Sequence, residues 1–180
     1  MTQLEDILVS AIEPGSRVLD LGCGKGNLLE RLITEKNVTG YGIEKKFNNI
    51  QECVKRGISV YQGNLNEGLL EFSKNAYDYV ILSLTLQEVM EPVYLLKEML
   101  RVGKKGIVTF PNFGYWHIRL DYLLSGNTPK TKTLPYDWYN TPNIRVLTIK
   151  DFRSLCKKEN VHIQKEIPLI ANTTLRRLFP

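Results

Sequence analysis

Hydrophobic residues along this chain follow two alternating patterns. Short apolar runs predict buried strands, and segments whose apolar residues recur three and four positions apart predict amphipathic helices. The predicted strands are residues 17–21, 39–44, 59–64, 78–83 and 106–110, and the predicted helices are residues 4–12, 26–36, 47–56, 68–74 and 91–101. Because strands and helices take turns, the sequence predicts an α/β fold with a doubly wound, mostly parallel, Rossmann-like sheet that helices cover on both faces.

The pattern changes after the last of these strands. Residues 111–143 follow no steady period and hold both tryptophans together with several prolines. A long segment of this kind inside a compact domain is usually a lid or a binding surface. In this part of the chain we expect a short helix at 116–124, a helix that runs from a capping box at 148–151 to about residue 160, and a strand at 161–169. We therefore expect one domain over residues 1–180, with an aromatic and proline-rich insert or lid at about 111–143.

Composition and charge narrow the classes of function. The chain has 180 residues and a net charge of +5, with 43% hydrophobic and 24% charged residues, as in ordinary soluble globular proteins. No apolar run approaches the ~20 residues of a membrane span, and the acidic N-terminus lacks the basic region of a signal peptide. The lysines and arginines are scattered among acids, which argues against nucleic acid as a partner. The three cysteines are far apart and form no C-x-x-C pair, so we expect no disulfide, no metal site and a cytoplasmic protein.

The strand at 17–21 runs into a glycine-rich turn. Asp20 and Leu21 precede Gly22, Gly24 and Gly26, and a helical pattern begins directly after them. Glycines allow positive φ angles and let a ligand come close to the backbone. The start of the following helix directs its free N–H groups and its positive dipole end to the same place. This combination predicts a nucleotide-type binding loop.

Two kinds of ligand use a loop like this, and two acids help to choose between them. A dinucleotide loop has the spacing G-x-G-x-x-G, which would need a glycine where this chain has Asn27. Asp20 stands just before the first glycine, where a carboxylate is unfavourable beside a pyrophosphate but favourable beside the ammonium and sulfonium groups of S-adenosylmethionine (SAM). Glu44 ends the next strand and can hold the ribose of either ligand. The glycine spacing and Asp20 therefore favour SAM.

Several stretches carry a resemblance to known families. The loop at 20–26 together with Glu44 resembles the SAM site of class I methyltransferases. More narrowly, the chain resembles the bacterial methionine biosynthesis protein MetW family in DYVILSLTLQ (78–87), TFPNFGYW (109–116), LPYDWYNTPNI (134–144) and TIKDF (148–152). The resemblance covers roughly residues 15–170 and rests mainly on the aromatic segment 134–144, because many methyltransferases share the glycine loop. It implies a SAM-binding fold that serves methionine synthesis in association with homoserine O-acetyltransferase.

The resemblance also implies roles for individual residues. Asp20 would orient the amino group of SAM, Glu44 would hold its ribose, and Asn64 and Leu65 would border its adenine. The other residues implied to contact SAM are Gly22, Cys23, Gly24, Gly26 and Ser83, and those implied on the side of a methyl acceptor or partner are Gln87, Tyr136, Trp138 and Tyr139. No residue is assigned as catalytic. For Cys23, packing in the turn is a better explanation than a role as nucleophile.

The sequence departs from the class I pattern at two points. Asn64 takes the place of the usual acid at the end of the third strand, so it adds no charge beside the adenine. The sequence also ends where the usual fold has a last antiparallel strand, and we expect that strand to be missing.

Three functions stay open at this stage. The first is a SAM-dependent methyltransferase with a small-molecule acceptor of unknown identity. The second is a non-catalytic subunit that senses SAM and adjusts the acetyltransferase through its aromatic segment. The third is an NAD-binding oxidoreductase, which ranks lowest because Asn27 would have to replace a glycine. Whether residues 111–143 enclose a pocket or form an exposed apolar patch distinguishes the first two.

Overall fold

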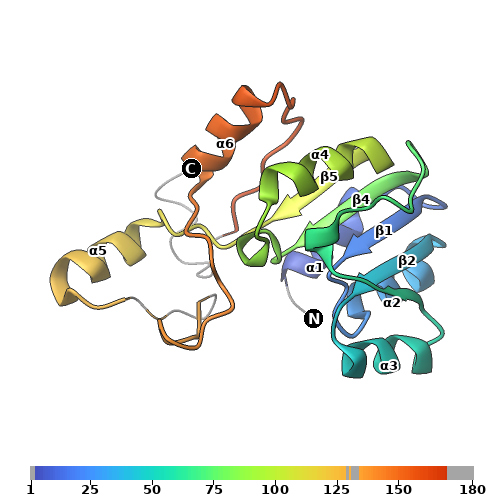
Figure 1. The fold of residues 1–180 in the computed structure, drawn as a ribbon, viewed down its shortest axis with the longest axis horizontal. Coiled ribbons are helices and arrows are strands. Elements are labelled where there is room, and N and C mark those ends of the chain that lie inside the picture. The colour runs from blue at the N-terminus through green and yellow to red at the C-terminus, as the bar shows by residue number, and fades with distance from the viewer. Residues whose placement is uncertain (1–2, 129, 131–133, 170–180) are drawn as a thin grey trace.

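A five-stranded parallel sheet forms the centre of the protein in the computed structural model, which describes residues 3–128, 130 and 134–169 (Figure 1). The strands are β1 (Arg17–Leu21), β2 (Thr39–Glu44), β3 (Ser59–Gln62), β4 (Tyr77–Ser83) and β5 (Gly103–Thr109), in the order β3-β2-β1-β4-β5. All four neighbouring pairs are parallel. The predicted α/β fold with a doubly wound parallel sheet is confirmed.

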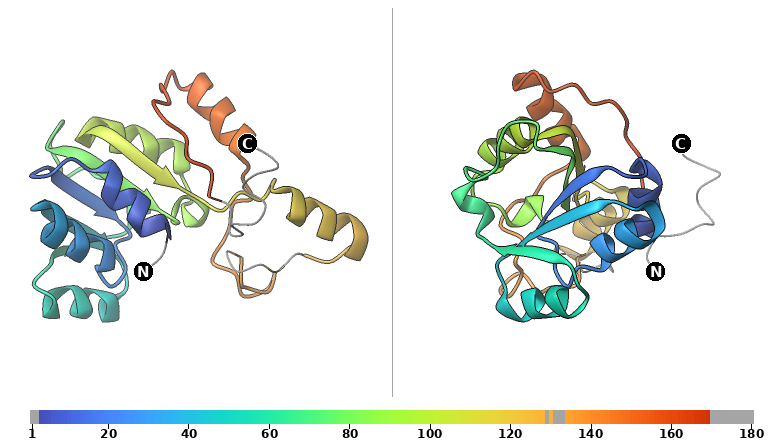
Figure 2. Two further views of the ribbon diagram at one scale, coloured as in Figure 1. Left: turned by 180° about the vertical axis from the view of Figure 1, so that it is seen from behind. Right: turned by 90° about the vertical axis from the view of Figure 1, so that its right-hand side faces the viewer.

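Helices cover both faces of the sheet (Figure 2). They are α1 (Gln3–Ala11), α2 (Asn27–Lys36) and α3 (Phe47–Lys55) on one face and α4 (Pro92–Val102) on the other. Because side chains of a strand point alternately to opposite faces, consecutive residues of β1 enter different cores. Val18 lies in the core beneath α1 and α2, whereas Leu19 lies in the core beneath α4, and both are fully buried.

The strand order reverses next to β1, which sets the position of the predicted site. From β1 the chain moves outward through β2 to β3 and then crosses to β4 on the other side of β1. Leu21, at the end of β1, pairs with Ile43 of β2 and with Leu82 of β4. The carboxyl ends of these three strands therefore meet at one edge, and open α/β sheets bind their ligands at such a switch point.

Two further helices follow β5. Helix α5 (Trp116–Ser125) confirms the short helix predicted at 116–124, and it stands apart from the sheet. Helix α6 (Ile149–Lys158) lies near α4, and its Phe152 packs on Phe110 with ring centroids 5.0 Å apart. No helix in the described ranges combines the length and the hydrophobicity that a membrane crossing requires.

Three predicted elements differ from the structure. The helix predicted at 68–74 is wrong: the chain forms a short 3₁₀ helix η1 (Leu65–Glu67) and then turns, with Gly68 at φ 84°. The strand predicted at 161–169 is also wrong, because these residues form no strand. β5 begins at Gly103, earlier than predicted. β5 is the last strand within the described residues. The expectation that a final antiparallel strand is missing also concerns residues beyond 169, which lie outside the described residues.

The capping box predicted at the start of α6 is confirmed and gives a test of stability. The Thr148 hydroxyl accepts the backbone N–H of Asp151 at 3.2 Å, and the Asp151 carboxylate accepts the backbone N–H of Thr148 at 3.0 Å. We expect Thr148→Ala to lower the free energy of unfolding by about 1 kcal/mol, measured by urea denaturation. Thr34→Ala, at an exposed position in the last turn of α2, is the matched control and should leave stability unchanged or slightly higher. Equal losses in the two variants would contradict the capping role.

Candidate functional site

The glycine loop connects β1 to α2 and is attached to the end of β2. Gly22, Gly24 and Gly26 have φ angles of 75°, 56° and 80°, so all three use the positive φ that the sequence predicts for them. The backbone N–H groups of Gly22 and Cys23 donate to the carbonyl of Ile43 at 2.8 and 3.1 Å. These bonds fix the loop over the carboxyl edge of the sheet.

The three glycines differ in the space around them. A Cβ on Gly26 would come within 2.5 Å of Ile58 Cδ1, and one on Gly22 would come within 3.0 Å of Thr85 Oγ1. A Cβ on Gly24 would meet no atom within 4 Å. Gly26 therefore lets the start of α2 pack closely on Ile58 and Cys53. Gly24 instead borders open space, in which a ligand can approach the backbone.

The crowding at Gly26 predicts a loss of stability. Gly26→Ala places a Cβ at positive φ, which costs about 1–2 kcal/mol, and it also overpacks the contact with Ile58, which costs about 1–3 kcal/mol more. Gly57→Ala is the matched control, because Gly57 has φ 72° but open space around its Cβ position. Chemical denaturation should show a clearly larger loss at Gly26 than at Gly57. Similar losses would mean that Ile58 moves aside freely.

Glu44 ties the glycine loop to the end of β2. Its carboxylate is buried and accepts three backbone N–H groups: Gly24 at 3.0 Å, Lys45 at 2.8 Å and Lys46 at 2.7 Å. A carboxylate has about four acceptor positions, so one remains for a further donor. Glu44 thus holds the loop in place and keeps an acceptor for a hydroxyl group next to Gly24.

Asp20 is a buried acid without a hydrogen-bond partner. Its residue is 3% exposed, and its carboxyl accepts no hydrogen bond from the described residues. Burial raises the pKa of Asp20 to about 7, and the charge of nearby Glu44 adds to the rise. An unpaired buried carboxyl is costly. A cationic group placed beside it would relieve that cost.

The thiol of Cys23 is a packing group in this structure. Its Sγ lies 4.0 Å from Sγ of Cys53 on α3, and both residues are buried. Burial raises the pKa of each thiol, so neither is a reactive thiolate at neutral pH. A Cβ on Gly42 would come within 2.5 Å of the Cys23 sulfur, so the β2 backbone leaves room for this side chain.

The remaining residues predicted to contact SAM also lie at the ends of the strands. The N–H of Gly63 donates to the carbonyl of Glu44 at 3.1 Å, which places the chain after β3 beside the end of β2. Asn64 follows and accepts the N–H of Asn66 at 3.3 Å, capping η1, while Leu65 packs partly buried on the core beneath α4. Ser83 ends β4, with its hydroxyl 3.2 Å from that of Thr109.

Gln87 makes backbone contacts with the end of the aromatic segment, which no pattern in the sequence predicts. It lies in a second 3₁₀ turn, η2 (Leu86–Glu88), and is 4% exposed. Its side-chain amide donates to the carbonyl of Leu84 at 2.6 Å, while its buried Oε1 accepts no hydrogen bond. Its backbone carbonyl accepts the N–H groups of both Ile144 and Arg145 at 3.0 Å. Gln87 therefore joins the chain after β4 to the end of the aromatic segment.

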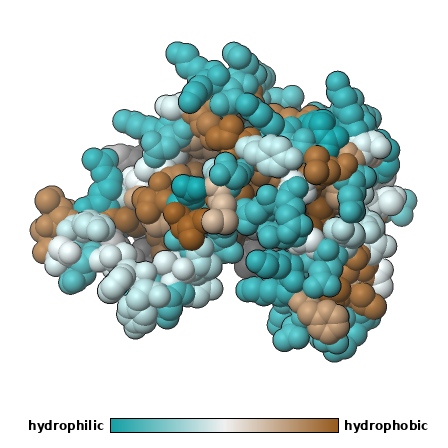
Figure 3. Space-filling view, viewed as in Figure 1, coloured by the Kyte–Doolittle hydropathy of each residue, from teal (hydrophilic) through white to brown (hydrophobic). Residues whose placement is uncertain are grey.

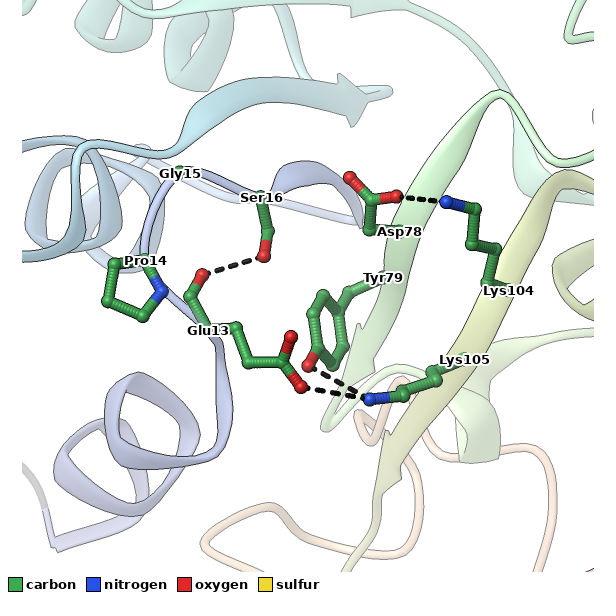
Figure 4. A pocket seen from close by; sticks show the side chains of 8 residues that line it. All are labelled: Glu13, Pro14, Gly15, Ser16, Asp78, Tyr79, Lys104 and Lys105. Carbon is green, nitrogen blue, oxygen red and sulfur yellow. Dashed lines mark hydrogen bonds and ion pairs between the residues drawn. The ribbon is translucent and has the colours of Figure 1, made fainter.

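The predicted aromatic residues lie on the surface. Tyr136, Trp138 and Tyr139 are 48%, 75% and 70% exposed. Two open cavities, of about 280 and 370 Å³, lie at the opposite edge of the sheet, where the strands begin, and residues 111–143 line neither. Figure 4 shows the first, in which Lys104 pairs with Asp78 and Lys105 pairs with Glu13. In the described part of the aromatic segment, these three rings are therefore exposed.

Comparison with known proteins assigns the family. The sequence model described as "Methionine biosynthesis protein MetW" matches residues 3–177. The chain belongs to the MetW family. A bifunctional methionine biosynthesis protein MetXA/MetW from Rhodopirellula baltica is 42% identical over 172 residues, which cover 91% of this chain and 28% of that protein. A demethylmenaquinone methyltransferase from Bacillus cereus is 28% identical over 57% of this chain and 46% of its own length. The chain thus spans less than half of each of these relatives.

Solved structures agree with the fold. A SAM-dependent methyltransferase from Archaeoglobus fulgidus superposes with a TM-score of 0.64 at 16% identity, over 86% of this chain and 67% of that one. A SAM-dependent methyltransferase from Thermotoga maritima, described as a possible histamine N-methyltransferase, gives a TM-score of 0.61 at 22% identity over the same shares. This MetW-family chain therefore has the class I methyltransferase fold.

Proposed function

We propose that this MetW-family chain binds SAM at the carboxyl edge of its sheet and acts in methionine biosynthesis together with homoserine O-acetyltransferase. The observation that carries the first part is Asp20, a buried carboxyl without a hydrogen-bond partner directly before the glycine loop. The MetW family and the relative named MetXA/MetW support the second part.

The residues at the carboxyl edge fit SAM. Asp20 offers a carboxylate to the amino group of the ligand, and the open space at Gly24 admits a ligand close to the backbone. Glu44 keeps one acceptor for a ribose hydroxyl. Asn64 borders the adenine without adding charge. The sulfonium of SAM supplies the reactive methyl group when it is bound.

The exposed aromatic segment favours an accessory subunit over an enzyme that encloses its acceptor. An acceptor pocket buries most of its ligand, yet Trp138 and Tyr139 are largely exposed. We therefore infer that the chain responds to SAM, the product that methionine synthesis feeds, and adjusts the acetyltransferase. Methyl transfer stays as the second candidate, because an acceptor that is already nucleophilic needs alignment rather than a catalytic base.

Calorimetric titration with S-adenosylhomocysteine tests the binding site. S-adenosylhomocysteine keeps the amino group, ribose and adenine of SAM, so we expect binding with a Kd in the micromolar range and no heat with NADH as control. A folded sample that binds NADH but not S-adenosylhomocysteine would overturn the assignment. The acetyltransferase part is tested separately, by measuring homoserine O-acetyltransferase activity with and without this chain, each at zero and saturating SAM.

A further inference from the structure

An exposed apolar surface lies on the part of the chain that leaves the sheet after β5. We call it the aromatic arm and define it as α5 (Trp116–Ser125) together with residues 134–139. Figure 1 and the left view of Figure 2 show α5 standing away from the sheet. In Figure 3, hydrophobic residues lie at the tip that α5 forms, next to paler ones.

The arm exposes large apolar side chains that a helix in water would normally hide. On α5, Leu123 and Leu124 are 79% and 77% exposed, and Ile118 is its one buried residue. Trp138 and Tyr139 add two more exposed rings, stacked edge to face with centroids 5.7 Å apart. Short helices in water depend on packing an apolar face for their stability. Because α5 packs so little of its surface on its own chain, the arm is built for contact with another surface.

The composition of the arm is that of a protein interface. Its exposed apolar residues are tryptophan, tyrosine and leucine, and Asp137, which precedes Trp138 in the sequence, forms an ion pair with Lys130. Aromatic residues supply most hot spots of protein interfaces, and charged residues are typical of the rim. Membrane-binding helices instead place many lysines and arginines opposite their apolar face, whereas α5 has one arginine, Arg119, and one acid, Asp121.

We propose that the aromatic arm is the surface that docks this chain on homoserine O-acetyltransferase. The inference rests on the proposed function for the identity of the partner. The Rhodopirellula baltica relative carries MetXA and MetW in one polypeptide, so in that protein the two parts are held together permanently. Two parts that act together meet through a surface, and the arm offers exposed apolar side chains of suitable composition.

The arm is also joined to the predicted SAM site. Its C-terminal continuation donates two backbone N–H groups, from Ile144 and Arg145, to the carbonyl of Gln87. Thr85, two residues before Gln87, lies against Gly22 of the glycine loop. The residues from Thr85 to Gln87 therefore connect the glycine loop to the chain that follows the arm. A partner on the arm and a ligand on the loop would not compete for the same surface.

The test uses the full chain and the homoserine O-acetyltransferase of the same organism, with binding measured by biolayer interferometry. We expect the double variant Leu123→Glu/Leu124→Glu and the single variant Trp138→Ala each to weaken association by at least about 30-fold. Val54→Glu is the matched control, because Val54 is an apolar residue of α3 that is 63% exposed and far from the arm in the fold. It should bind the acetyltransferase like the wild type. All variants should keep the wild-type affinity for S-adenosylhomocysteine, which also shows that they are folded.

The outcomes separate this proposal from the proposed function. Wild-type association that survives both arm variants would overturn the arm as the docking surface while leaving the partnership intact. Absence of wild-type association, with normal binding of S-adenosylhomocysteine, would overturn both the partnership and the docking proposal but not the SAM site. If size-exclusion chromatography shows a dimer of this chain that only the arm variants dissociate, the arm joins two copies and the docking proposal is wrong.

Discussion

Replacing Asp20 by asparagine should abolish measurable binding of S-adenosylhomocysteine. The wild-type carboxyl is buried, lacks a hydrogen-bond partner and faces no compensating cation among the described residues. An amino group of the ligand would supply that cation, and a charge-assisted hydrogen bond at a largely buried carboxylate is among the stronger polar contacts. Asparagine has nearly the same shape but no charge. We therefore expect the affinity to fall at least about 100-fold in calorimetric titration.

The same residue should make the affinity depend on pH. Since burial raises the pKa of Asp20 to about 7, the carboxyl is mostly protonated in the free protein at lower pH and must ionise before it can hold an ammonium group. The affinity should then fall with the ionised fraction of Asp20, by about 50-fold between pH 7 and pH 5. A pH-independent affinity over this range would show that the ligand does not depend on ionised Asp20.

Asp20 should also affect stability in the absence of ligand. Its pKa is higher in the folded protein, about 7, than the 3.8 of a free carboxyl. Between these values the folded state binds more protons than the unfolded state, so stability falls as the pH rises from 4 to 7 and is constant above. The shift corresponds to at most about 4 kcal/mol. Urea denaturation of Asp20→Asn should show a flatter pH profile than the wild type.

Asp78→Asn is the control for the Asp20 experiments. Asp78 starts β4 at the opposite edge of the sheet, where Lys104 and Arg17 lower the pKa of its carboxyl. Removing its charge should reduce stability at neutral pH and leave the affinity for S-adenosylhomocysteine unchanged. If Asp78→Asn weakened ligand binding as much as Asp20→Asn, the loss would reflect general destabilisation instead of a contact with the ligand.

The elements with a strong local pattern could be predicted from the sequence. The glycine loop follows β1, and Asp20 and Glu44 lie near the ends of β1 and β2, so their place at one edge follows from the parallel pairing of these strands. The start of α6 carries its own signal in the Thr148 capping box. These features depend on neighbours within a few residues, or on the regular alternation of strand and helix.

The features that the sequence did not reveal depend on distant partners. A helix at 68–74 fails because Gly68 takes φ 84° and lies where a Cβ would meet the Tyr94 hydroxyl at 2.6 Å. β5 begins before its apolar run because Gly103 and Lys105 already pair with Tyr77 and Tyr79 of β4. The bonds from Ile144 and Arg145 to Gln87 join residues that no periodic pattern relates.

The last prediction compares Gly24, in the glycine loop, with Gly57, because the Cβ positions of both residues are open. Gly24→Leu should abolish binding of S-adenosylhomocysteine while the protein stays folded. The side chain starts from a Cβ position with no atom within 4 Å, so it fills the space beside the loop where the ligand is proposed to lie, and the N–H bond to Glu44 can persist. The positive φ of 56° costs about 1–2 kcal/mol of stability.

Gly57→Leu is the matched variant for this experiment, because Gly57 follows α3 with φ 72° and its Cβ position is equally open. The backbone cost should be similar in the two proteins, so equal unfolding midpoints with binding lost only in Gly24→Leu would place the ligand beside the loop. Retained micromolar binding by Gly24→Leu would mean that the ligand approaches the sheet elsewhere. In that case the open space at Gly24 would belong to solvent, and Asp20 would need a different cation.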